Sequence, residues 1–111
     1  MMEQLTDKQV CMLVDEFYTE SHEDIVGLFA IAQAVEDLIG NNEITREQAL
    51  RVVEALLAKG MVAGDSPYHP GGYKPWANQE RSAVINRIRS EWQQLGHSPS
   101  IPDIAWFGPP R

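Results

Sequence analysis

The sequence predicts a mostly α-helical fold of four helices with one small β-hairpin. Four stretches carry apolar residues at the three- and four-residue spacing of an amphipathic helix. After the third stretch, Gly60 is followed by a short apolar segment, a loop rich in proline and glycine, and a second short segment, an order typical of a strand, a turn and a returning strand. The chain has 111 residues, of which 43% are hydrophobic, so residues 1–111 are long enough for a single domain with one core.

The first helix is predicted over residues 8–20. Thr6 or Asp7 can cap its start. Its apolar stripe consists of Val10, Leu13, Val14 and Phe17. The single cysteine, Cys11, rules out an internal disulfide, and its apolar neighbours predict a small buried side chain rather than a reactive thiol.

The second helix is predicted over residues 23–39. Ser21 followed three residues later by Asp24 is a variant of the capping box that opens many helices. Apolar residues cover more than one side of this helix, so we expect it to lie at the centre of the bundle. Gly40 and the two asparagines after it tolerate the left-handed conformation that ends a helix.

The third helix is predicted over residues 45–59, with Thr45 and Gln48 as a capping box and Gly60 as its stop. Residues 61–63 then form the first strand of the hairpin, and residues 73–76 form the return. We expect the loop between them to be exposed. Within it, Tyr68 is predicted on the surface, and Trp76 at its end in the core.

The fourth helix is predicted from Asn78, which can cap its start, to Leu95. Residues 97–111 contain four of the seven prolines, which excludes a long helix there. The apolar residues at 104–107 would be poorly placed in water. We therefore expect this proline-rich tail to pack back on the domain, with residues 104–107 as an edge strand.

The net charge of −7 is concentrated in the first part of the chain. Residues 1–43 hold ten acidic residues and one basic residue, Lys8, whereas residues 44–111 hold six acidic and eight basic residues. An acidic surface repels phosphate backbones and attracts basic protein surfaces. A basic protein partner is therefore expected, and nucleic acid is not. The other explanation is a solvated acidic face that only keeps the protein soluble.

The sequence also predicts a cytoplasmic protein with no membrane partner. No apolar run approaches the roughly 20 residues that a membrane-spanning helix needs. The first residues lack the basic and apolar regions of a signal peptide. Nothing in the sequence predicts an oligomeric state.

No catalytic or metal-binding motif stands out. His22, His69 and His97 are far apart, and the chain has neither the paired cysteines nor the paired histidines of a zinc site. The glycine pair in the loop lacks the Lys-Ser or Lys-Thr of a phosphate-binding loop. Asp65 and His69 are the one candidate acid/base pair, on a short loop. We expect no enzyme activity, no metal and no cofactor.

Two surfaces are candidates for binding a partner. The first is acidic and lies on the first two predicted helices, and its candidate residues are Asp15, Glu16, Glu20, Glu23 and Asp24. The second is the aromatic loop, whose candidate residues are Tyr68, His69 and Tyr73. Amphipathic aromatic side chains of this kind dominate the energetics of protein interfaces.

Residues 25–76 resemble the winged-helix superfamily. The resemblance rests on residues 55–62, ALLAKGMV, which are similar to the family's usual passage from its last helix into the wing. It implies a winged-helix-like helix–strand–wing unit whose third helix reads DNA, so that Arg46, Arg51 and Lys59 would contact phosphates. The chain departs from the family in having one clear helix, over residues 23–39, where a helix-turn-helix pair is usual. A DNA-binding transcriptional or phage regulator is the alternative function.

The small size, the acidity and the lack of catalytic residues resemble the general character of the immunity proteins that neutralise bacterial toxins. Nuclease toxins tend to be basic around their active sites, so an acidic partner associates rapidly and occludes the site. The leading hypothesis is therefore a non-enzymatic immunity or inhibitor protein that binds a basic, nuclease-type toxin. A third possibility is a structural module whose apolar tail completes a neighbouring copy.

Overall fold

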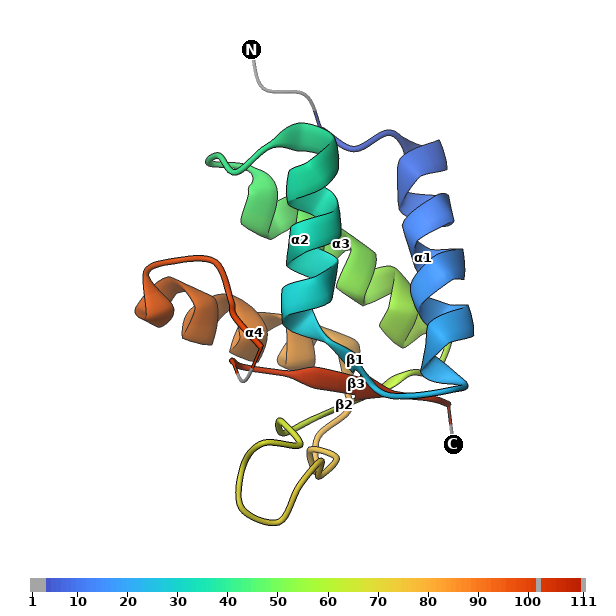
Figure 1. Cartoon of the computed structure of the whole chain (residues 1–111), viewed down its shortest axis with the longest axis vertical. Coiled ribbons are helices and arrows are strands. Elements are labelled where there is room, and N and C mark those ends of the chain that lie inside the picture. Colours follow the sequence, from blue (N-terminus) through green and yellow to red (C-terminus); the bar gives the residue numbers. More distant parts are fainter. Residues whose placement is uncertain (1–3, 102, 111) are drawn as a thin grey trace.

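Four helices and a small antiparallel sheet make up the computed structural model, which describes residues 4–101 and 103–110. The elements follow one another as α1, β1, α2, α3, β2, α4 and β3. Figure 1 shows the sheet below α1, α2 and α3, with the loop that follows β2 projecting away from the helices. The predicted fold class, mostly helical with a small β element, is confirmed.

Helix α1 (Asp7–Ser21) has the predicted cap. The backbone N–H of Gln9 donates to Thr6 Oγ1 at 3.0 Å, and the backbone N–H of Thr6 donates to Gln9 Oε1 at 2.9 Å, so two end amides are satisfied reciprocally. The prediction that Cys11 is buried is wrong. The apolar stripe of α1 faces α3, and Cys11 lies beside it on the exposed surface.

The predicted start of the second helix is also wrong. Ser21 is the last residue of α1, is buried, and donates its hydroxyl to the Tyr18 carbonyl at 2.6 Å, so it caps nothing that follows. Strand β1 (Val26–Gly27) comes next, and α2 (Leu28–Ile39) begins only after it. Gly27 has an extended backbone and caps α2 without a side chain. Pairing with another strand therefore overrides the local helix signal.

Helix α3 (Thr45–Ala58), and not α2, is the central helix. It packs against α1, α2 and α4. Its predicted capping box is replaced by longer-range contacts: the Thr45 hydroxyl donates to the Gly40 carbonyl at 2.7 Å, and Gln48 Oε1 accepts from the Leu5 backbone at 3.1 Å. Its buried side chains are Thr45, Gln48, Ala49, Leu50, Val52, Val53, Leu56 and Leu57.

The tail supplies the middle strand of the sheet. Strand β3 (Trp106–Gly108) lies between β1 and β2 (Val62–Gly64), antiparallel to both, with Phe107 opposite Val26 and Ala63. The tail thus packs back as expected, but its strand is central and not at the edge, and Phe107 is fully buried. The pairing within one chain also gives no support to a tail that completes a neighbouring copy.

The predicted return of the hairpin runs along the outer side of β2. Pro75 forms an isolated bridge with Gly64, the Trp76 N–H donates to the Ala63 carbonyl at 2.9 Å, and the Asp65 N–H donates to the Lys74 carbonyl at 2.9 Å. This segment covers the outer edge of β2, since its amides and carbonyls pair with those of the strand.

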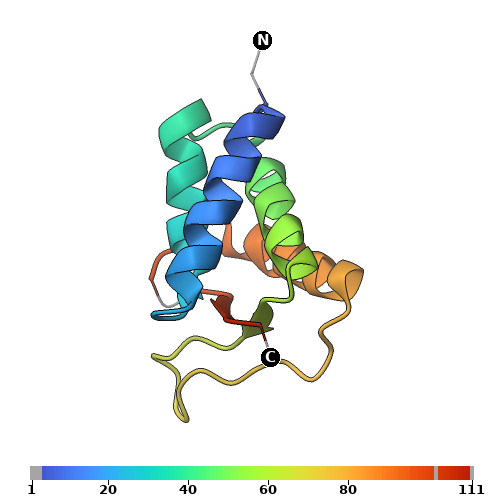
Figure 2. The same cartoon turned by 90° about the vertical axis from the view of Figure 1, so that its right-hand side faces the viewer.

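Helix α4 (Arg81–Leu95) lies crosswise beside α3 (Figure 2). Its N-cap is Glu80, not Asn78: the Glu80 carboxylate accepts from the backbone N–H groups of Ser82 and Ala83. Asn78 instead accepts from the Glu80 N–H at 3.0 Å. Gly96 ends the helix in the left-handed conformation, at φ 77°.

Candidate protein-binding surface

The acidic surface of α1 and the turn after it is fully available to a partner. All five of its predicted residues are exposed: Asp15, Glu16, Glu20, Glu23 and Asp24. None of them forms an ion pair with a base in the described part of the chain. Asp24 Oδ1 accepts the backbone N–H of Ile25 at 2.8 Å, which shapes the turn. We call these five residues the acidic face.

The three bases proposed to contact DNA have partners inside the molecule. Arg51 donates to the Leu5 carbonyl at 2.7 Å and pairs with Asp7. Arg46 pairs with Glu47 at 3.3 Å. Lys59 Nζ lies 5.0 Å from the centre of the Tyr18 ring, within the range of a cation–π contact.

Helices α3 and α4 are bridged by a bidentate ion pair. Arg89 Nη2 lies 2.7 Å from Glu47 Oε1, and Arg89 Nε lies 3.0 Å from Glu47 Oε2. The hydrogen bonds from Arg89 hold the pKa of Glu47 below its ordinary value of 4.5, against the opposing effect of partial burial. The pair spans 42 positions in the chain and fixes α4 against the side of α3 that α1 and α2 leave open.

In the aromatic loop, Tyr68 is exposed to solvent, whereas Tyr73 packs against the sheet. Tyr68 is 67% exposed, and His69 is exposed beside it. Tyr73 is half-buried, and its hydroxyl donates to the Val62 carbonyl at 2.7 Å. Its ring lies against Gly64 and Gly108, where an added Cβ would come within 3 Å of Tyr73 atoms. Tyr73 is therefore placed to pack the sheet rather than to meet a partner.

Asp65 does not form an acid/base pair with His69. Asp65 Oδ1 accepts from Trp76 Nε1 at 2.9 Å and lies 4.0 Å from Arg87. The Arg87 guanidinium also lies 3.7 Å from the centre of the Trp76 ring. This arrangement fixes Trp76 in the core, as predicted, where its side chain is 7% exposed.

Sequence reasoning missed an aromatic patch around the exposed tyrosine. The Tyr68 ring lies 6.0 Å from the Trp106 ring, and Trp106 lies 5.7 Å from Phe29. Trp106 donates its indole N–H to the Ile101 carbonyl at 3.2 Å, and the Ile101 side chain is 49% exposed. Trp106 itself is buried, at 8% exposure, and lies behind Tyr68. We call Phe29, Tyr68 and Trp106 the aromatic patch. The apolar residues of the tail were the only sign of this patch in the sequence. The pairing of β1 with β3 is what brings Phe29 beside Trp106.

The turn after α1, which carries part of the acidic face, lies at the same end of the molecule as the aromatic loop. Figure 1 and Figure 2 both show the turn after α1 and the loop after β2 at the end that carries the sheet. The structure therefore brings the segment of residues 22–25 and the loop of residues 65–75 to one end of the molecule.

The described residues contain no group of three or more histidines, cysteines or acidic side chains placed to hold a metal ion. Within the same ranges, no helix is long and apolar enough to cross a membrane. Comparisons with protein-family models, with curated proteins and with solved structures found no match to the chain. A functional assignment rests on the surfaces of the molecule alone.

Proposed function

We propose that the protein is a non-enzymatic inhibitor of the immunity-protein type, which binds a basic, nuclease-type bacterial toxin in the cytoplasm and occludes its active site. The observation that carries the proposal is the unpaired acidic face. Its five carboxylates have no basic partner among the described residues, while Arg46, Arg51, Arg87 and Arg89 are paired within the molecule. The excess negative charge is thus exposed along α1 and the turn after it.

An exposed charge of one sign acts mainly on the rate of association. It attracts a basic partner over distances of about 8–10 Å at moderate salt and orients it before contact. A stable complex also needs slow dissociation. The aromatic patch can supply it, because aromatic side chains at an interface mainly slow dissociation. Acidic face and aromatic patch together fit a partner that is basic at its rim and has an apolar hollow for Tyr68.

The test starts from a basic protein captured from cells that express the chain, with binding kinetics then measured on the purified pair. Reversing Asp15, Glu16 and Glu20 to lysine should slow association at least tenfold at low salt. The matched control reverses Asp37, Glu43 and Glu54 to lysine, a change of the same total charge on exposed acids outside α1. An equal loss in both triple variants, or an unchanged rate in the first, contradicts the proposal.

Tyr68→Ala separates the two surfaces. We expect faster dissociation with little change in the association rate, because the side chain is neutral and 67% exposed in the free protein. Tyr73→Phe is the control on the same loop: it removes only a hydroxyl directed at the sheet. If Tyr68→Ala leaves dissociation unchanged, the aromatic patch has no part in the interface.

The alternative, a DNA-binding regulator, has less support from the geometry. Helix α3 would be the reading helix, yet it is packed against three other helices. Two of its three bases, Arg51 and Lys59, are held by contacts within the molecule, and Arg46 keeps only its terminal nitrogens open. Fluorescence anisotropy with labelled duplex DNA tests it directly. Salt-dependent binding that Arg46→Ala together with Arg51→Ala abolishes would favour the regulator over the inhibitor.

A further inference from the structure

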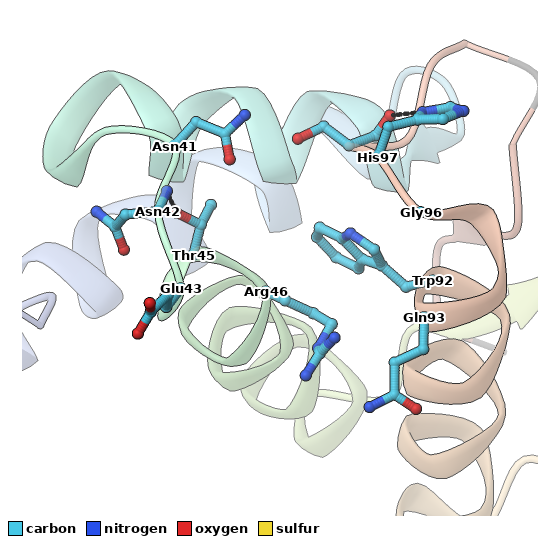
Figure 3. Close-up of a pocket in the computed structure, with 10 residues that line it drawn as sticks. Asn41, Asn42, Glu43, Thr45, Arg46, Trp92, Gln93, Gly96 and His97 are labelled. Carbon is cyan, nitrogen blue, oxygen red and sulfur yellow. Dashed lines mark hydrogen bonds between the residues drawn. The ribbon is translucent and has the colours of Figure 1, made fainter.

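A polar pocket opens on the side of the molecule away from α1, between the α2–α3 connection and the last turn of α4. Its volume is about 520 Å³, within the range of small-molecule sites. Figure 3 shows Asn41 and Arg46 on one wall and Trp92, Gln93 and His97 on the other. The acidic face and the aromatic patch contribute no residue to this pocket.

The wall formed by the α2–α3 connection is held in place by its own hydrogen bonds. Asn42 Nδ2 donates to the Ile39 carbonyl at 2.8 Å, Asn42 Oδ1 accepts from the Ile44 N–H at 3.0 Å, and Thr45 Oγ1 accepts from the Asn42 N–H at 2.9 Å. On the other wall, Ser98 Oγ donates to Glu36 at 2.7 Å and ties the segment after α4 to α2. The pocket is therefore a fixed feature of the packing of three helices.

Trp92 has a hydrogen-bond donor that nothing in the described part of the chain accepts. Its side chain is 7% exposed, and its indole N–H makes no hydrogen bond with a described residue. The other two indoles do, with Trp76 donating to Asp65 and Trp106 to Ile101. No described side-chain nitrogen or oxygen is both fully buried and unpaired. The Trp92 indole nitrogen therefore keeps some exposure, and its indole projects into the pocket (Figure 3).

The free donors around the pocket define the ligand chemistry. Arg46 uses Nε on Glu47, which leaves its two terminal nitrogens without a partner in the described chain. The Gln93 amide is exposed beside it and is also unpaired among the described residues. Arg46 is the one permanently charged base of the lining, and Glu43 is its one acid. One guanidinium with neutral donors suits a singly charged acceptor better than a doubly charged phosphate.

We propose that this pocket binds a small carboxylic acid, whose carboxylate accepts hydrogen bonds from Trp92 Nε1 and the Arg46 guanidinium. The site is independent of the toxin-binding surface, and a failure of either proposal leaves the other standing. A carboxylate fills a small part of about 520 Å³, so the remaining space takes the body of the acid against the Trp92 ring.

The test uses the ¹⁵N-labelled protein and benzoate as the probe. Its spectrum contains three indole N–H resonances, one for each tryptophan. We expect benzoate to move the Trp92 resonance saturably and to leave those of Trp76 and Trp106 in place, because the latter two are already hydrogen-bonded. Benzamide, the uncharged probe of the same shape, and inorganic phosphate should bind at least tenfold more weakly.

Arg46→Gln should weaken benzoate binding at least tenfold while the backbone spectrum remains that of the folded protein. Arg81→Gln is the matched control, since Arg81 is exposed, forms no described ion pair and lies outside the pocket. Equal binding of benzoate and benzamide, an unchanged affinity in Arg46→Gln, or no saturable shift of the Trp92 resonance would each overturn the proposal.

Discussion

The Gln79 side chain joins the outer edge of the sheet to the segment that leads into α4. Its Oε1 accepts from the Ala63 N–H at 2.9 Å, and its Nε2 donates to the carbonyls of Ala63 at 2.8 Å and of Trp76 at 2.7 Å. The Gln79 amide thus completes the pairing at this edge of β2, because it binds the Ala63 N–H that the returning segment does not. We expect Gln79→Ala to be among the most destabilising polar substitutions in the protein.

The size of the expected loss in stability depends on which hydrogen-bond partners each backbone group keeps in Gln79→Ala. The Ala63 N–H loses its partner in a residue that is 0% exposed, and a buried unsatisfied donor costs about 1–3 kcal/mol. The Ala63 carbonyl keeps its hydrogen bond from the Trp76 N–H at 2.9 Å. Each of the two bonds from Gln79 Nε2 therefore adds no more than about 1.5 kcal/mol to the loss of stability. The expected loss in the free energy of unfolding is about 3 kcal/mol.

Urea unfolding followed by circular dichroism measures this loss. Gln94→Ala is the control, because Gln94 is exposed on α4 and its side chain makes no hydrogen bond with the described residues. Gln79→Glu sharpens the test: a carboxylate keeps the acceptor but sets a second oxygen against two carbonyls, so it should destabilise at pH 7 and recover as acid protonates it. A Gln79→Ala protein within about 0.5 kcal/mol of the wild type refutes the reasoning.

Three further predictions concern charge, packing and accessibility. Glu47 has a lowered pKa in the folded state, so its ion pair with Arg89 stabilises fully above the ordinary pKa of 4.5 and is lost as pH falls through the folded value. The stability difference between wild type and Glu47→Gln, at most about 1 kcal/mol for so exposed a pair, should therefore shrink in acid. In Gly64→Ala the new Cβ would lie 2.6 Å from the Lys74 carbonyl oxygen, so we expect a loss of about 2 kcal/mol in chemical denaturation. Cys11 is exposed, and it should react completely with a chromogenic disulfide reagent without denaturant; protection of the thiol would contradict its placement on α1.

Three of the four helices could be predicted from local signals. α1, α3 and α4 carry apolar stripes over several turns, and Gly60 and Gly96 follow the ends of α3 and α4 with positive φ angles of 97° and 77°. Each signal depends only on residues within one or two turns of each other. Such signals survive tertiary packing, and the predicted ends lie close to the observed ones.

The short strands could not be predicted in the same way. β1 has two residues and β3 has three, too few for an alternating pattern to show. Val26 fits an apolar helix stripe as well as it fits a strand, and its partner Phe107 lies some eighty positions away. Only the pairing of these distant segments decides where α2 begins and places the tail in the middle of the sheet.

The candidate surfaces were also only partly predictable from local sequence patterns. The part of the acidic face on α1, Asp15, Glu16 and Glu20, was predictable, because charged residues opposite an apolar stripe remain exposed on an outer helix. The partners of the bases were not, since Arg51 meets Asp7 across 44 positions and Arg89 meets Glu47 across 42. The aromatic patch and the pocket around Trp92 likewise join segments that no local pattern connects.

The position of α4 changes what the resemblance to winged-helix proteins implies. That resemblance makes α3 the helix that enters a DNA groove, and such a helix needs a free face. Here α1, α2 and α4 all pack on α3, and the Arg89–Glu47 pair holds α4 in place. α1, in contrast, packs mainly on α3 and β1, which leaves its outer side with Asp15, Glu16 and Glu20 facing solvent. Since a partner can recognise only an exposed surface, we expect it to bind the outer helix and the sheet end rather than the helix at the centre.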